Sequence, residues 1–222
     1  MFVTFKNKYS ENFLNKNQNH LKPNSRAKKW KPVTLFEIQS FVTVLINMDI
    51  KPQPTVYSYW WTYSSHPIPW FPRIFTRNRF QAILQFFHMV DCSNLPKSGQ
   101  PNYDPCARFN PLVDHVNRLF KHYFVPGQKL SVDESMISTK SNSQLKQYLL
   151  RKHHRWGVKL WMFCDSATYH CINFFVYRGS DRNEIKEKGK GHTIIVKLLE
   201  IGNLLNKDYY IFVDNFFTSL KH

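Results

Sequence analysis

Apolar residues recur every three or four positions through the first half of the chain, the spacing of a helix that packs one face against a core. The first stripe follows Thr34, which can cap a helix together with Glu37 three residues later, and it stops at Lys51-Pro52. A second stripe follows Thr76, and a third runs up to Val125-Pro126-Gly127. We therefore predict three helices. Their apolar positions are Leu35, Ile38, Phe41, Val42, Leu45 and Ile46; Phe80, Ile83, Leu84, Phe86 and Phe87; and Leu112, Val113, Val116, Leu119 and Phe120.

The pattern changes after Gly127, where β-branched and aromatic residues form short unbroken runs bounded by turn residues. Such runs are typical of buried strands. Basic loops separate them, and one apolar stripe near the end of the chain has helical spacing. The expected elements are strands at 129–133, 158–164, 171–177 and 208–213, loops at 138–157 and 178–192, and a helix at 193–206.

The order of these elements, three strands followed by a helix and a further strand, predicts half of a mixed α/β sheet. The helix acts as a crossover that brings the last strand back parallel to the first. Each of these two strands ends on an aspartate, Asp133 and Asp214. We therefore expect both carboxylates at the same edge of the sheet, on neighbouring strands.

A carboxylate at the end of a buried strand is costly to desolvate, so it usually has a cation or a hydrogen-bond donor beside it. Asp133 and Asp214 together could hold divalent metal for phosphoryl transfer, although two metal ions generally need three or more carboxylate oxygens. Glu134 follows Asp133 directly and should point to the opposite face. Asp165 also ends a strand, but Ser166-Ala167-Thr168 favours a turn in which this aspartate bonds the backbone.

The chain has 222 residues, with 31 Lys and Arg against 15 Asp and Glu, which gives a formal charge of +16. A surface this basic attracts polyanions, so nucleic acid is the leading partner, and a ribosomal-type or merely basic protein is the alternative. Cations in the loop at 138–157 alternate with Tyr148 and Trp156, which can stack on bases. A solvated hairpin is the other interpretation, and Trp161 is expected in the core. The candidate DNA contacts are Lys140, Lys146, Arg151, Lys152, Arg155 and Lys159.

Residues 1–31 are rich in Asn and Lys and show little periodicity, so we expect a flexible basic arm. Its cluster from Lys22 to Lys31 suits phosphate contact or nuclear import, or is a solvated tail. Four cysteines without a C-x-x-C pair indicate a reduced intracellular compartment, and Cys106 with His153 and His154 fits no zinc finger. No apolar stretch approaches the roughly 20 residues that span a bilayer, and the first residues have no h-region, so we expect no signal peptide.

Six stretches, taken in order, resemble the piggyBac family of transposases and the proteins derived from it. No single stretch is specific, but the ordered set is, and it extends over about residues 32 to 222. The stretches are Arg79–His88, Leu130–Met136, Leu145–Leu149, Arg155–Trp161, Cys164–Ser166 and Val213–Ser219.

This resemblance implies an RNase H-like catalytic domain, preceded by a mostly helical dimerisation and DNA-binding region. It also implies cut-and-paste DNA transposition at TTAA sites in the nucleus, through a Mg²⁺-dependent triad of aspartates. Asp133 matches the first aspartate of the triad and Asp214 the second. The third lies beyond the point where this chain ends, eight residues after Asp214, as does the family's cysteine-rich zinc domain. Lys140-Ser141-Asn142 replaces the family's usual Lys-Gly-Arg, which removes an arginine from a loop expected to face DNA.

The resulting fold class is α/β, an RNase H-like mixed sheet that is incomplete at the C-terminus and follows a mostly helical region. The expected domains are the basic arm at 1–31, the helical dimerisation and DNA-binding region at 32–125, and the first part of the catalytic domain at 126–222.

We expect a transposase-derived protein that binds double-stranded DNA but is inactive alone in transposition. The protein is expected to be able to form a homodimer. We expect it to bind neither a membrane nor a small-molecule cofactor. Two alternatives remain: an incomplete sequence of an active Mg²⁺-dependent transposase, and a non-catalytic DNA-binding or interaction module.

Overall fold

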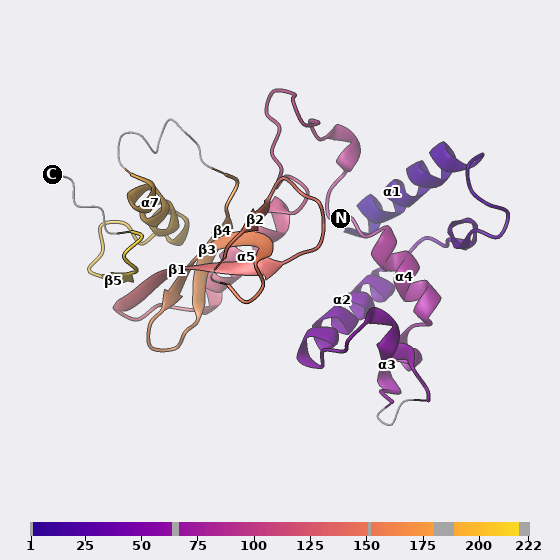
Figure 1. Cartoon of the computed structure of the whole chain (residues 1–222), viewed down its shortest axis with the longest axis horizontal. Helices are drawn as coiled ribbons and strands as arrows, with labels where there is room; N and C mark the ends of the chain where they lie inside the picture. Colours follow the sequence, from indigo (N-terminus) through magenta and orange to yellow (C-terminus); the bar gives the residue numbers. More distant parts are fainter. Residues whose placement is uncertain (1, 64–66, 151, 180–188, 218–222) are drawn as a thin grey trace. The chain divides into compact units, whose positions relative to one another are not determined.

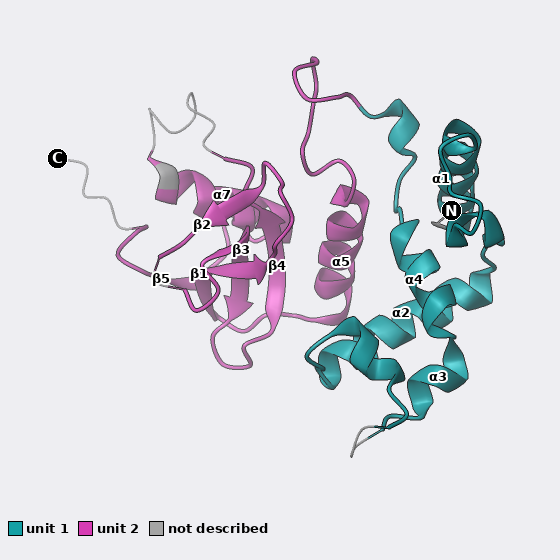
Figure 2. Ribbon diagram, turned by 45° about the vertical axis from the view of Figure 1, so that its right-hand side comes forward, with its two compact units in different colours: residues 1–95 teal, residues 96–222 magenta. Residues whose placement is uncertain are grey.

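Two units make up the computed structural model, Met1–Leu95 and Pro96–His222, which Figure 2 shows in different colours. The structure describes residues 2–63, 67–150, 152–179 and 189–217. Helices dominate the first unit and a sheet the second, as Figure 1 shows. The chain is thus a mixed α/β protein with a mixed sheet, as the strand and helix pattern predicted.

The first unit consists of helices joined by short 3-10 turns. Thr34 and Glu37 form the predicted capping box at the start of α2, and the Thr76 side chain accepts a hydrogen bond from the Arg79 backbone at the start of α4. The aromatic and aliphatic core includes the fully buried Phe41 and Phe80. The elements are α1 (Phe2–Asn17), η1 (Arg26–Lys29), α2 (Leu35–Ile50), η2 (Val56–Trp60), α3 (Trp70–Ile74), α4 (Arg77–Gln85) and η3 (Cys92–Asn94).

Residues 2–17 form helix α1, which differs from the flexible arm expected for residues 1–31. Lys6 is only 1% exposed, and its Nζ donates a hydrogen bond to the Ile83 carbonyl at 2.8 Å. Tyr9 and Phe13 pack against Phe86. Few apolar residues mark this helix, because it docks through aromatic rings and through a buried lysine whose ammonium bonds a backbone carbonyl.

Within the described residues, the strands of the second unit form one five-stranded sheet. β3 (Trp156–Asp165) lies antiparallel to β1 (Lys129–Ser138), β2 (Lys146–Tyr148) and β4 (Cys171–Val176). After β4 the chain passes through helix α7 (Lys190–Gly202), and β5 (Tyr210–Val213) then pairs parallel to β1. The predicted crossover and parallel return are confirmed.

Successive side chains of β1 and β3 point to opposite faces of the sheet and pack into two separate cores, one on each face. Leu130, Val132 and Trp161 pack with Leu198 of α7. On the other face, Leu160 and Val176 pack with Val113 of α5 (Asn110–Tyr123) and with Cys106. Helix α5 therefore belongs with the sheet, so the division between the units, after Leu95, lies well before the expected boundary at 125/126.

Two strand boundaries differ from the prediction. β1 continues to Ser138 instead of ending at residue 133, because its ladder with β3 runs unbroken from Leu130 to Ser138. The expected loop at 138–157 contains β2, whose three residues pair with β3 from Trp156 to Val158. Local sequence gave no sign of either, since both depend on pairing with a distant strand.

Within the described ranges, no helix combines the length and the apolar character that crossing a membrane requires.

Candidate metal and nucleic-acid site

The parallel ladder between β1 and β5 sets the positions of the two aspartates. Val132 pairs with Val213 as the last of four matched residues, and Asp133 and Asp214 follow immediately on the two strands. Neighbouring strands are about 4.8 Å apart, and residues at matched positions of a parallel pair project to the same face. The predicted arrangement on neighbouring strands is thus confirmed by the register.

Asp133 does not end its strand, contrary to the prediction. Its neighbours remain in the ladder with β3, where Asp133 pairs with Met162 and Glu134 with Trp161. Asp214 does follow the end of β5, and a turn begins after it. One carboxylate therefore stands on a continuous strand and the other at a strand terminus, where the sheet opens to solvent.

Both carboxylates are exposed and have the same local hydrogen bond. Oδ1 of Asp133 accepts from the Glu134 backbone N–H at 2.7 Å, and Oδ1 of Asp214 accepts from the Asn215 N–H at 2.6 Å. Exposed aspartate oxygens are the hard donors that Mg²⁺ prefers, with water completing its shell. Among the described residues, no group of three or more His, Cys, Asp or Glu side chains is placed to hold a metal. The donor set fits one water-rich Mg²⁺ and no more.

Glu134 points to the opposite face, as predicted, and it holds a lysine there. Its carboxylate pairs with Lys159 Nζ at 3.0 Å and with Lys152 Nζ at 3.9 Å. Lys159 also lies 3.9 Å from the centre of the Trp161 ring. Lys159 was expected to contact DNA, but it is buried, with its ammonium held by this ion pair and ring. The sequence predicted only that Glu134 faces away from Asp133, and this alone did not indicate that Lys159 is buried.

Asp165 is a structural residue, as its turn pattern indicated. Its Oδ1 accepts from the backbone N–H groups of Ala167 and Thr168 and from the Thr168 hydroxyl, and its Oδ2 accepts from the Gly127 N–H at 2.7 Å. These donors, the Thr168 N–H first, lower the pKa of the carboxyl. With its oxygens engaged in this way, Asp165 ties the β3–β4 turn to the residues that lead into β1.

Three of the remaining candidate DNA contacts lie close to the end of β1, on β2 and at the start of β3. Lys140 and Arg155 are exposed, and Lys146 Nζ lies 5.1 Å from the Trp156 ring centre. Tyr148 and Trp156 face each other across the strands with rings 4.8 Å apart and remain 47% and 53% exposed. Cations beside solvent-exposed aromatic rings suit a nucleic-acid backbone with accessible bases. Arg151, another predicted contact, lies outside the described residues.

A family model described as Transposase IS4 matches residues 5–222. The chain belongs to this family. The piggyBac resemblance that the sequence stretches suggested is confirmed by relatives and by a solved structure.

Two human proteins are similar over the same length. PiggyBac transposable element-derived protein 3 is 31% identical over 148 residues, which are 65% of this chain and 24% of that protein. The chimeric ERCC6-PGBD3 protein is 31% identical over 148 residues, 65% of this chain and 13% of its own length. The chain thus spans about a quarter or less of the length of these curated relatives.

A solved structure shares the fold. The cryo-EM structure of a piggyBac transposase synaptic complex with hairpin DNA superimposes with a TM-score of 0.73 and 16% identity. The match covers 96% of this chain and 47% of the transposase chain. Both units of this chain therefore have counterparts in a transposase.

Proposed function

We propose that this chain is a transposase-derived DNA-binding protein whose second unit is an RNase H-like fold with the first two carboxylates of a three-aspartate site. The observation that carries the proposal is the β1–β5 register, which brings Asp133 and Asp214 to matched positions. The family membership and the DNA in the synaptic complex support it. The Mg²⁺ cofactor and the nuclear location are parts of this proposal.

Asp133 and Asp214 are the residues that would hold Mg²⁺. When bound, the ion supplies Lewis-acid stabilisation of phosphate oxygens and lowers the pKa of a bound water. The protein keeps Asp133 in place through the β1–β3 ladder, and the N–H groups of Glu134 and Asn215 orient the two carboxylates. A pair of carboxylates gives weak, single-ion binding, so we propose that this chain alone binds DNA without completing transposition.

The metal proposal is tested by titrating the protein with Mn²⁺, an EPR-active substitute for Mg²⁺. We expect one weak site, with affinity at least tenfold lower in Asp133→Asn and in Asp214→Asn. Asp208→Asn is the matched control, because Asp208 is an exposed aspartate before β5 and should leave binding unchanged. Equal Mn²⁺ binding in all four proteins would reject the site.

The inactivity proposal needs a separate assay with supercoiled plasmid DNA that contains TTAA sites. We expect binding in Mg²⁺ buffer without strand cleavage by the unmodified chain. Nicking that Asp133→Asn abolishes would show an active nuclease and overturn this part of the proposal.

A second candidate, a binding module without metal chemistry, is favoured by the exposed Tyr148 and Trp156 beside Lys146. For this function, duplex binding should be unaffected by Asp133→Asn and Asp214→Asn and should weaken when the cations around these rings are replaced. The Mn²⁺ titration separates the two candidates, since only the first requires a metal.

A further inference from the structure

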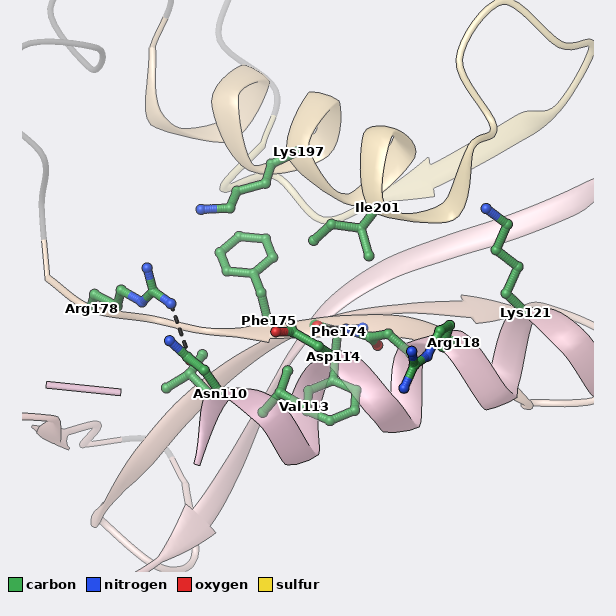
Figure 3. A pocket seen from close by; sticks show the side chains of 12 residues that line it. Asn110, Val113, Asp114, Arg118, Lys121, Phe174, Phe175, Arg178, Lys197 and Ile201 are labelled. Carbon is green, nitrogen blue, oxygen red and sulfur yellow. Dashed lines mark hydrogen bonds between the residues drawn. The ribbon is translucent and has the colours of Figure 1, made fainter. Parts of the chain in front are cut away.

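A cavity of about 350 Å³ lies in the second unit, bounded by α5, α7 and β4. Figure 3 shows it from close by. Among the described strands, β4 pairs only with β3, so two strands, β3 and β1, separate it from β5. The cavity therefore lies at the sheet edge opposite the strand that precedes Asp214.

Four exposed cations surround this cavity, and they fall into two pairs. Figure 3 shows Arg178 and Lys197 at one end and Arg118 and Lys121 at the other. Lys197 Nζ lies 4.7 Å from the Phe175 ring centre. Arg178 hydrogen-bonds Asn110 near the start of α5 and forms an ion pair with Asp104 at 3.3 Å, whereas Lys121 lies near the end of that helix. From the helix rise, Asn110 and Lys121 are about 16 Å apart along α5.

Apolar side chains line the middle of the cavity, between the two cationic ends. Val113 and Ile201 project toward it from the two helices, and Phe174 and Phe175 come from β4. Among the described residues that line the cavity, Asp114 carries the single carboxylate, and it also lies between the two ends in Figure 3. A ligand that fits needs negative charge at both ends and an apolar, uncharged centre.

The backbone of β4 contributes little to binding here, because its edge is already closed at Phe174. The Asn117 side chain donates to the Phe174 carbonyl at 2.8 Å and accepts from the Phe174 N–H at 3.0 Å. This amide occupies the place of a neighbouring strand and blocks strand addition at that residue. Recognition therefore depends on the side chains of the cavity.

We propose that this cavity binds an acidic peptide segment of a protein partner, extended, with carboxylates at both ends and an apolar residue between them. An extended chain advances about 3.3 Å per residue, so roughly five residues bridge the two cationic ends. Single-stranded nucleic acid fits less well, because it carries a phosphate at every nucleotide and would place one beside Asp114. Arginine forks and lysine ammonium groups both pair well with carboxylates.

The proposal is tested by fluorescence anisotropy on the full chain with a labelled Glu-Glu-Leu-Phe-Leu-Glu-Glu peptide. We expect saturable binding that weakens at least tenfold in Lys121→Glu and in Lys197→Glu, which alter opposite ends of the cavity. Lys207→Glu is the matched control for net charge, because Lys207 is exposed and does not line the cavity, and it should change affinity less than twofold. Replacing the central Leu-Phe-Leu by Ser-Ser-Ser should weaken binding at least fivefold.

A labelled five-nucleotide single-stranded DNA serves as the competing probe. Lys121→Glu and Lys197→Glu should affect it no more than Lys207→Glu does. Peptide binding that is absent, or equally affected by all three variants, overturns the proposal. A larger loss for the oligonucleotide than for the peptide assigns the cavity to nucleic acid, and the peptide proposal then fails.

Discussion

Lys6 shows how one residue can decide the placement of a whole helix. Its ammonium bonds the Ile83 carbonyl near the end of α4 and lies 5.3–5.7 Å from the ring centres of Trp30, Phe41 and Phe87. That carbonyl belongs to the last turn of a helix, where carbonyls lack partners within the helix. Lys6 thus connects α1 to α4, at the cost of burying an amine that is normally charged.

Burial, with a contribution from the positive charge of Arg79, lowers the pKa of Lys6 to about 7. An unfolded lysine has a pKa near 10.4, so between pH 7 and 10 the unfolded chain binds more protons than the folded one. The free energy of unfolding should therefore rise with pH across that window.

Lys6→Met should remove this rise, which we expect to be roughly 2–4 kcal/mol between pH 7 and 10. Urea unfolding at several pH values measures it. Lys16→Met, an exposed lysine on the same helix, should keep the pH dependence of the unmodified protein. Identical pH profiles for Lys6→Met and the unmodified protein would contradict a buried titrating amine.

At the scale of elements, the sheet depends on contacts that join turns to strands. Asp165 is 2% exposed and accepts from both the β3–β4 turn and Gly127, just before β1. The sequence after Asp165 predicted a turn, which the structure has, whereas β1 continues past Asp133, where the sequence predicted that the strand ends. Aspartates that follow apolar runs thus have different functions according to the backbone beyond them.

Asp165→Ala should lower the free energy of unfolding by about 2–4 kcal/mol, because several partly buried N–H donors would lose their acceptor. Chemical denaturation followed by tryptophan fluorescence measures the loss. Asp208→Ala, at an exposed aspartate, should change stability by less than about 0.5 kcal/mol. A small loss in Asp165→Ala would mean that water replaces the carboxylate easily.

At the scale of the whole molecule, the basic residues that give the charge of +16 have different roles. Lys159 and Lys152 neutralise Glu134, and Arg79 pairs with Glu37 at 2.8 Å, so these cations stabilise the fold. Lys140 and Arg155 are exposed at the end of β1 and the start of β3, and Lys146 lies beside them on β2. Of these two groups, the second is the one placed to meet a polyanion from solvent.

The salt dependence of duplex binding should therefore follow the exposed cations. The plot of log affinity against log salt should become shallower by about 2 in the double variant Lys146→Ala/Arg155→Ala, because each phosphate contact contributes about 0.9 to the slope. Lys129→Ala, at the opposite end of β1, is the control and should leave the slope unchanged. A slope unchanged in the double variant would place the DNA elsewhere on the molecule.

The sequence by itself determined the order of α2, α4, α5, β1, β3, β4, α7 and β5, the caps at Thr34 and Thr76, the turn at Asp165, and the placement of Asp133 and Asp214 on neighbouring strands. These features follow from local periodicity, from capping and turn chemistry, and from the handedness of a crossover, all of which can be read along the chain.

Only the tertiary structure decided the length of β1, the docking of α1 through Lys6 and the burial of Lys159 against Glu134 and Trp161. It alone brought Arg178, Lys197, Arg118 and Lys121 around one cavity. Each of these features joins residues that are distant in sequence, and no local pattern encodes the free energy of such contacts.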